Sequence, residues 1–297
     1  MSTLQELIGQ LQVEQLELNL FRGVSADIGS PNVFGGQVLG QALAAAARTV
    51  EEGRSVHSLH AYFLRPGDKK APIVYDVDRI RDGKSFTTRR VVAIQHGQPI
   101  FNSSMSFQVR EEGVEHQDKM PDVPGPEGLM NDVEWRKTLL HHLPERVHKS
   151  FLRHRPMEMR EVEPMDPFNP VPQPASYCAW IRAEQALPDD PVLHQSMLAY
   201  SSDFSLLQAA MRPHAMSFAQ RDLQIASLDH AMWFHRDFRM DDWLLYVIDS
   251  PSTSSSRGLC RGKFFTRDGR LVASTAQEGL IRRVKPEVKP SSSGAVP

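Results

Sequence analysis

Cysteine is scarce in this sequence: Cys178 and Cys260 are the only two among 297 residues. A disulfide framework or a structural zinc site needs more cysteines at closer spacing than the 82 positions that separate this pair. The scarcity excludes a small disulfide-stabilised domain and favours a reducing compartment. We therefore expect neither disulfides nor a metal site built on cysteine.

An excess of one charge is also missing. Lysine and arginine number 34 against 36 aspartate and glutamate, giving a net charge of −2, and the basic residues are scattered along the chain. Nucleic-acid binding usually needs a basic block or stripe, so we expect no nucleic-acid partner.

Long apolar runs are absent as well. The first residues are interrupted by acids and carry no apolar core of the kind found in secretory signals, and the last residues do not form a Ser-Lys-Leu peroxisomal signal. The most apolar stretch, residues 34–50, is shorter than the roughly 20 residues that cross a bilayer, and it contains Gln37 and Gln41. We expect no membrane insertion and a cytoplasmic location.

That stretch nevertheless organises the first half. It is rich in alanine and small residues, which favours a buried helix with close-packed neighbours. A meander of strands follows, separated by turn sequences, at residues 58–64, 73–80, 85–95 and 100–109. A long central helix gripped by a curved antiparallel sheet is the hotdog architecture. Ahead of it we expect a short amphipathic helix at 4–11 and a strand at 16–21 with Leu16, Leu18 and Leu20 on one face.

The pattern then repeats. Ten of the 21 prolines lie between Pro121 and Pro174, around a helix-like segment at 134–148, which indicates a linker. Beyond it Ser227-Leu-Asp-His-Ala231 resembles Ser58-Leu-His-Ala61, about 170 residues earlier, which indicates two copies of one domain. The further predicted elements are strands 156–162 and 176–184, a helix at 193–211, and strands 223–234, 243–248, 257–266 and 271–281.

We therefore predict an α+β tandem hotdog, each half a long helix wrapped by a curved antiparallel sheet. The predicted division is an N-terminal hotdog at 1–115, a proline-rich linker at 116–152, a C-terminal hotdog at 153–284 and a disordered tail at 285–297.

The most informative polar residue is Asp203, which falls on the inward face of the predicted 193–211 helix. A carboxylate there is costly unless it is partnered, and such carboxylates concentrate at functional sites. The alternative is that Asp203 reaches water or caps a kink. Ser227 and Gln277, on later strands, complete an acid, a hydroxyl and an amide that together can hold a water.

Other motifs exclude familiar chemistries. There is no Gly-x-Ser-x-Gly elbow, and the glycines around Gly35 and Gly36 do not form a nucleotide-binding loop. Histidine pairs at odd spacing on strands point to opposite faces, so we expect no metal site. Four arginines at matching places in the two halves are candidates for phosphate contacts, the alternative being solvated strand-edge side chains: Arg89, Arg90, Arg257 and Arg261.

Taken together, four motifs resemble type II acyl-CoA thioesterases over residues 4–283. They are Phe34-Gly-Gly-Gln37, the stretch from His57 to Asp68, the stretch from Leu228 to His235, and Ala273-Ser-Thr-Ala-Gln-Glu-Gly279. The resemblance implies a double hotdog that hydrolyses acyl-CoA without a cofactor and assembles into homo-oligomers, dimers or tetramers.

For the site, the resemblance implies a water-activating trio of Asp, Thr and Gln. Asp203 and Gln277 match, and Ser227 stands where the family has threonine. Serine keeps the hydroxyl without the methyl that stiffens χ1, so we expect activity to survive at a reduced level. Gly35, Gly36 and His57 are the candidates for oxyanion or substrate contacts, and no acyl-enzyme is required.

The first half lacks an equivalent acid and has Met105 opposite Gln277, which predicts one active centre per chain. Two rivals remain: a hotdog enoyl-CoA hydratase using Asp229 and His230, and a non-catalytic acyl-CoA sensor or binding protein.

Overall fold

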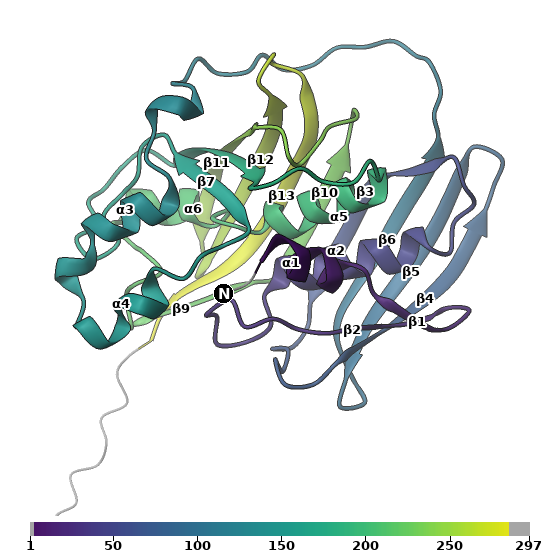
Figure 1. The fold of residues 1–297 in the computed structure, drawn as a ribbon, viewed down its shortest axis with the longest axis horizontal. Helices are drawn as coiled ribbons and strands as arrows, with labels where there is room; N and C mark the ends of the chain where they lie inside the picture. Colours follow the sequence, from purple (N-terminus) through teal and green to yellow (C-terminus); the bar gives the residue numbers. More distant parts are fainter. Residues whose placement is uncertain (1–2, 285–297) are drawn as a thin grey trace, which may run out of the picture.

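One continuous antiparallel sheet wraps around two central helices in the computed structural model, which describes residues 3–284 (Figure 1). The first-half strands are β1 (Glu14–Glu17), β2 (Leu20–Gly23), β3 (Arg54–Phe63), β4 (Ile73–Asp82), β5 (Phe86–Gln95) and β6 (Gln98–Val109). The second-half strands are β7 (Met157–Glu161), β8 (Ser176–Ala183), β9 (Leu223–Ser227), β10 (Asp229–Phe234), β11 (Leu244–Ser254), β12 (Arg257–Thr266) and β13 (Leu271–Arg283).

The strand order is a mirrored repeat. It runs β1-β2-β4-β5-β6-β3 and then β10-β13-β12-β11-β8-β7, with β9 added beside β13. β3 and β10 pair at the centre and join the two halves into one sheet. This order confirms the predicted double hotdog.

The helices are α1 (Leu4–Leu11), α2 (Gly35–Ala47), α3 (Asp132–Thr138), α4 (Glu145–Phe151), α5 (Pro191–Ser202) and α6 (Gln208–Met211). α1 and α2 confirm the helices predicted at 4–11 and 34–50. The predicted 134–148 helix is divided into α3 and α4 by a 3₁₀ turn and by Pro144. Proline disfavours the helical conformation in the residue before it, so a helix does not continue through Leu143. None of the helices in the described part of the chain is long and apolar enough to cross a membrane.

The two central helices, α2 and α5, pack against each other at unusually short range (Figure 1). A Cβ added at Gly36 would lie 2.1 Å from the Tyr200 carbonyl oxygen, and one added at Gly40 would lie 2.8 Å from the Ser196 carbonyl oxygen. The helices are therefore antiparallel, and the beginning of α2 lies against the end of α5. Glycine is needed at this crossing because any side chain would push the helix backbones apart.

The proline-rich segment crosses the outer face of the second-half sheet. Met120, Val123 and Leu129 pack on a small outer core that includes Trp180 and Trp243, and the Trp180 indole donates to the Pro124 carbonyl at 2.8 Å. The segment thus covers apolar strand residues that would otherwise face solvent. The domain limits at 115 and 152 stay a prediction, and the tail predicted at 285–297 lies outside the described residues.

One predicted strand is wrong. Residues 16–21 span the end of β1, a two-residue turn at Leu18 and Asn19, and the beginning of β2, and the Glu17 carboxylate accepts from the Leu18 amide at 2.8 Å. Leu16, Leu18 and Leu20 are all exposed, Leu18 by 60%. The alternating leucines predicted one strand with a buried face. The hairpin instead lies at the edge of the sheet, where no other layer covers these side chains.

Two further predicted elements are interrupted. The 193–211 helix ends at Ser202 and resumes as α6, with Ser205 in the left-handed region at φ 59°. Within its last turn the Ser202 hydroxyl bonds back to the Ala199 carbonyl, a competition with helical bonding that is typical of serine. The 223–234 strand is divided at Leu228 into β9 and β10.

The helix crossing makes a direct prediction for stability. Gly36→Ala forces the α2 and α5 backbones apart, and we expect it to lower the free energy of unfolding by about 3 kcal/mol. Gly9→Ala is the matched control, because Gly9 lies in α1 with nothing within 4 Å of an added Cβ. That variant should be neutral or about 0.5–1 kcal/mol more stable. Urea unfolding measures both, and equal stability of the two variants would contradict the close crossing.

Candidate active site

Asp203 is the residue that follows α5, and its carboxylate meets the beginning of α2. Its Oδ2 accepts a hydrogen bond from the Gly36 amide at 2.9 Å. Phe34, the N-cap residue of α2, has no side-chain hydrogen bond to the helix. Asp203 therefore caps α2 from the other half of the molecule, where the helix dipole favours a negative charge. The prediction that Asp203 lies on the inward face of a continuous 193–211 helix is wrong, because α5 ends at Ser202. The alternative of a cap at a kink is met in part: the helix is interrupted at Asp203, but the helix that Asp203 caps is α2.

Ser227 and Gln277 complete the cluster from two adjacent strands. The Ser227 hydroxyl, at the end of β9, lies 3.3 Å from Asp203 Oδ1. Gln277 Nε2, on β13, donates to the Ser227 hydroxyl oxygen at 2.9 Å. Gln277 is 1% exposed, whereas Asp203 and Ser227 are only partly buried. The structure thus brings together the three residues predicted as a trio, with their open side at Asp203 and Ser227.

Aromatic rings and a small cavity flank Asp203. Phe34 stacks on Phe204 with ring centroids 4.7 Å apart, and Tyr200 meets the edges of both. Tyr200 and Phe204 also line a small cavity, together with Met157 and the basic segment that contains Arg153 and Arg155. An apolar wall next to a carboxylate, with cations at its rim, suits a ligand that has an apolar part and an anionic part.

Gly35 and Gly36 both lie beside Asp203, but only the Gly36 amide is hydrogen-bonded to it. The Gly36 N–H is engaged by Asp203, so it is not available to a substrate oxygen in this arrangement. A Cβ on Gly35 would lie 2.7 Å from Asp203 Oδ2, which places Gly35 directly beside the carboxylate. Within residues 3–284, the Gly35 N–H has no hydrogen-bond acceptor.

His57 is not brought to this cluster. Phe63, at the other end of β3, is the residue that contacts Gly35, and six strand residues span roughly 20 Å. His57 instead lies edge-on to Phe86 with ring centroids 5.6 Å apart, and burial lowers its pKa. The structure gives it no contact with the site.

The four predicted phosphate contacts are also held elsewhere. Arg89 is 1% exposed and bonds Thr49 and Asp82 at the far end of α2. The other three form ion pairs on exposed strand surfaces: Arg90 with Asp78, Arg257 with Glu278 and Arg261 with Asp249. The spacing of residues along a strand predicts which face of the sheet an arginine lies on. It does not show which carboxylate the neighbouring strand places beside that arginine.

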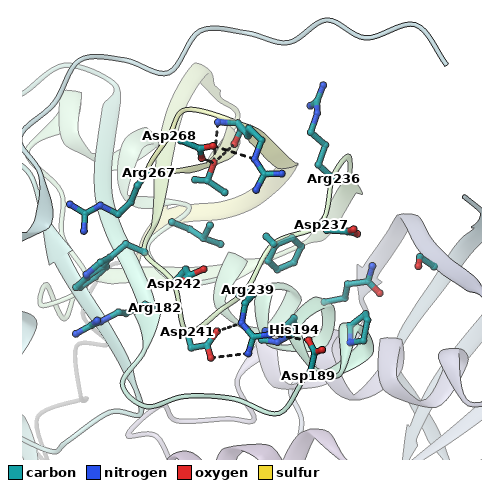
Figure 2. Close-up of a pocket in the computed structure, with 18 of the residues that line it drawn as sticks. Arg182, Asp189, His194, Arg236, Asp237, Arg239, Asp241, Asp242, Arg267 and Asp268 are labelled. Carbon is teal, nitrogen blue, oxygen red and sulfur yellow. Dashed lines mark hydrogen bonds and ion pairs between the residues drawn. The ribbon is translucent and has the colours of Figure 1, made fainter. Parts of the chain in front are cut away.

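A surface hollow of about 1,020 Å³ lies at the other end of α5 from Asp203, and Figure 2 shows the side chains that line it. It includes Asp189 and His194, at the beginning of α5, whereas Asp203 follows the end of that helix. Figure 2 shows Arg239 held by Asp189 and Asp241, each at 3.0 Å. The remaining arginines of its lining are also paired with carboxylates: Arg110, Arg182, Arg236, Arg267 and Arg270. Size alone therefore does not mark the site.

Two residues outside the predicted trio extend the cluster inward: His230, which the sequence suggested only for the hydratase alternative, and Ser202. His230 Nδ1 lies 2.5 Å from Gln277 Oε1, and His230 Nε2 lies 2.9 Å from the Ser202 hydroxyl. The signal was present in the sequence, because Ser227-Leu-Asp-His-Ala231 has one residue more than Ser58-Leu-His-Ala61. In the described part of the chain, no three His, Cys, Asp or Glu side chains gather where they could hold a metal ion.

Comparison with known proteins decides the family. A model described as acyl-CoA thioesterase matches residues 147–280, and one described as acyl-CoA thioesterase N-terminal domain matches residues 24–108. The chain is 42% identical to acyl-CoA thioesterase 2 of Haemophilus influenzae, over 94% of this chain and 98% of that protein. The chain belongs to the acyl-CoA thioesterase family.

Further relatives support this family assignment, and one more distant structure shows the same fold. Human acyl-coenzyme A thioesterase 8 is 40% identical over 95% of this chain and 90% of its own length. The crystal structure of an acyl-CoA thioesterase II from Mycobacterium marinum is 46% identical, covers 94% of this chain and 98% of that one, and superposes with a TM-score of 0.75. A hotdog protein from Alicyclobacillus acidocaldarius, 20% identical with a TM-score of 0.76 over 94% of this chain and 98% of that one, shows the same fold.

The capping role of Asp203 makes a prediction that is independent of activity. Asp203→Ala leaves the Gly36 amide without its acceptor, and we expect the free energy of unfolding to fall by about 1–2 kcal/mol. Asp203→Asn keeps an oxygen for this bond and should lose about half as much. Urea unfolding of both variants checks the order, and an alanine variant as stable as wild type would show that Asp203 does not cap α2.

Proposed function

We propose that this chain hydrolyses acyl-CoA thioesters to a free acid and CoA, using a water held by Asp203, Ser227 and Gln277. The observation that carries the proposal is the convergence of three side chains on one partly open point: a carboxylate just after α5, a hydroxyl on β9 and an amide on β13. Membership of the acyl-CoA thioesterase family supplies the substrate class.

Asp203 is arranged to act as the base. Its Oδ2 is fixed by Gly36, while the contact of Oδ1 with the Ser227 hydroxyl is long at 3.3 Å, so a water can compete for Oδ1. Asp203 takes a proton from this water as the water oxygen attacks the thioester carbon. The tetrahedral intermediate then expels the CoA thiolate, and the proton held on Asp203 neutralises it. No acyl-enzyme forms.

The developing oxyanion requires donors close to Asp203. The Gly35 N–H is our candidate, because it lies at the positive end of α2 and has no acceptor among residues 3–284. Gly36 is not part of this proposal, since its N–H holds the base.

The hydratase alternative finds no support in the geometry. The Asp229 carboxylate accepts from the Glu278 backbone amide at 2.6 Å, and His230 bonds Gln277 and Ser202. These two side chains do not form an acid–base pair with each other, so the hydratase has no dyad here.

We further propose that the CoA phosphates bind at the rim of the cavity beside Asp203. Arg155 is exposed there, and within the described chain it has no hydrogen bond or ion pair. Its neighbour Arg153 bonds the Asp27 carbonyl. An arginine that is not neutralised by a carboxylate is available to a phosphate, in contrast to the four arginines predicted from the sequence.

Homo-oligomerisation as a dimer or tetramer and a cytoplasmic location complete the proposal. They rest on the family resemblance and on the scarcity of cysteine. Light scattering on the purified chain measures its oligomeric state.

The decisive experiment measures release of CoA thiol from acyl-CoAs of graded chain length. We expect wild type to turn over, and Asp203→Asn to lose about a hundredfold or more in kcat because the base is removed. Asp229→Asn keeps a side-chain oxygen for the Glu278 amide, so it is the matched control and should keep most activity. Loss in the Asp229 variant alone, with hydration of an enoyl-CoA, would favour the hydratase. Binding of acyl-CoA without thiol release by wild type would identify a binding protein.

Arg155→Ala tests the phosphate contact. We expect KM for an acyl-CoA to rise about tenfold, equivalent to about 1.4 kcal/mol, with kcat little changed. The same acyl group on N-acetylcysteamine, which lacks the phosphates, should show no difference between the variant and wild type. Arg261→Ala, which removes an arginine already paired with Asp249, is the control. An equal effect on both substrates would overturn the assignment.

A further inference from the structure

Tyr200, in the last turn of α5, carries a hydroxyl group that no other group in the described chain uses. The side chain is 4% exposed, and among residues 3–284 its hydroxyl has no hydrogen-bond partner. The hydroxyl oxygen is also not fully enclosed, and Tyr200 lines the small cavity beside Phe204 and Met157. The hydroxyl therefore opens into that cavity. A nearly buried hydroxyl without a partner is unfavourable, so it calls for a ligand or a water.

The ring of Tyr200 is held on two sides, which fixes the direction of its hydroxyl. Phe34 and Phe204 each meet the ring edge-on, with ring centroids 5.3 Å from that of Tyr200. The backbone of Tyr200 lies against Gly36, where an added Cβ would be 2.1 Å from the Tyr200 carbonyl oxygen. A side chain that is already held in one position loses little entropy when it binds a ligand.

The other polar side chains that line the cavity are engaged, with one exception. The Asp27 carboxylate forms an ion pair with a lysine at 2.9 Å, and Arg153 donates to the Asp27 carbonyl. His154 forms an ion pair with a glutamate at 2.7 Å. Within the described chain, the side-chain donors of the cavity that remain available to a ligand are therefore the exposed Arg155 and the Tyr200 hydroxyl.

The chemistry of these two groups determines what they can bind. Burial raises the pKa of Tyr200 to about 12, and the Arg155 guanidinium offsets part of that rise. The phenol therefore keeps its proton at physiological pH and acts as a donor. Two donors match a ligand that carries acceptor oxygens. The cavity is about 20 Å³, which is room for about one water-sized group, so a single oxygen atom can enter it but a chain cannot.

Tyr200 lies between the places proposed for the two ends of the substrate. Arg155, at the rim, is the proposed phosphate contact, and Asp203 holds the water that attacks the thioester. Tyr200 precedes Asp203 by three residues, roughly 4.5 Å along the helix axis. The part of CoA between its phosphates and its sulfur is the pantetheine arm, which contains two amide groups. An arm that crosses the mouth of the cavity can direct one amide carbonyl oxygen at Tyr200.

We propose that the Tyr200 hydroxyl donates a hydrogen bond to an amide carbonyl oxygen of the pantetheine arm of acyl-CoA. This bond sets how deeply the thioester enters beside Asp203. The inference rests on the proposed function for its substrate class. Tyr200 is a binding residue in this role and takes no part in the proton transfer.

A binding experiment tests the proposal without turnover. S-hexyl-CoA and S-hexyl-pantetheine are thioethers that cannot be hydrolysed, and only the first carries the CoA phosphates. We expect Tyr200→Phe to weaken the binding of both about threefold to tenfold in calorimetry, because a neutral hydrogen bond is lost. Arg155→Ala should weaken only S-hexyl-CoA. Tyr62→Phe, which changes a ring that is 59% exposed, is the matched control and should bind both thioethers as wild type does.

The other outcomes are distinguishable. Weaker binding of S-hexyl-CoA alone by Tyr200→Phe would assign the hydroxyl to a phosphate. Unchanged binding of both thioethers would exclude the pantetheine arm, because neither thioether has an acyl oxygen. Either result would overturn the proposal, as would failure of wild type to bind S-hexyl-pantetheine. If both thioethers bind as expected but wild type releases no thiol from acyl-CoA, only the hydrolase function is contradicted.

A stability measurement checks that the Tyr200 hydroxyl has no partner within the protein. Tyr200→Phe removes an unpaired group, so the urea midpoint should stay the same or rise. Tyr246→Phe is the contrast, because the Tyr246 hydroxyl donates to the Ser202 carbonyl at 2.7 Å, and its midpoint should fall. A fall of similar size in Tyr200→Phe would show that the hydroxyl is already bonded in the free protein, contrary to the proposal.

Discussion

The bond from the Gly36 amide to the Asp203 carboxylate is the interaction on which the site depends. A carboxylate just after a helix is unfavourable by itself, because the carbonyl end of α5 carries partial negative charge. The positive end of α2 lies directly against it and offsets that cost. This is possible only because glycine at positions 36 and 40 lets the two helix backbones approach within the range of backbone contacts. The packing of the two helices and the position of Asp203 thus depend on the same glycines.

It follows that the two halves of the duplicated chain have divided the site between them. The second half contributes the side chains Asp203, Ser227 and Gln277, and the first half contributes the beginning of α2 with Gly35 and Gly36. The first helix therefore takes part in this cluster through its backbone, without an acid of its own. Joining the halves through β3 and β10 is what holds α2 at the end of α5.

Two errors of the sequence predictions fall at the candidate site. The predicted helix at 193–211 breaks at Asp203, and the predicted strand at 223–234 breaks at Leu228. In both places a side chain bonds to the backbone where the regular helix or strand pattern ends. The Ser202 hydroxyl donates to the Ala199 carbonyl, and the Asp229 carboxylate accepts from the Glu278 amide. Periodicity assumes an unbroken element, so it misses the two irregularities that direct Asp203 and His230 toward Gln277. The sequence also did not show the carboxylates that pair with Arg90, Arg257 and Arg261, since a strand pattern does not show the partner strand.

The sequence by itself determined the double hotdog, the helices at 4–11 and 34–50, most strands, and the identities of the acid, hydroxyl and amide. These follow from local properties: apolar periodicity, small residues, turn chemistry and family motifs. Only the tertiary structure decided that Asp203 caps the opposite helix, that Gly36 is engaged by it, and that His57 lies elsewhere. Those facts depend on contacts between residues as far apart as Gly36 and Asp203, and no local pattern encodes the distance between two backbones.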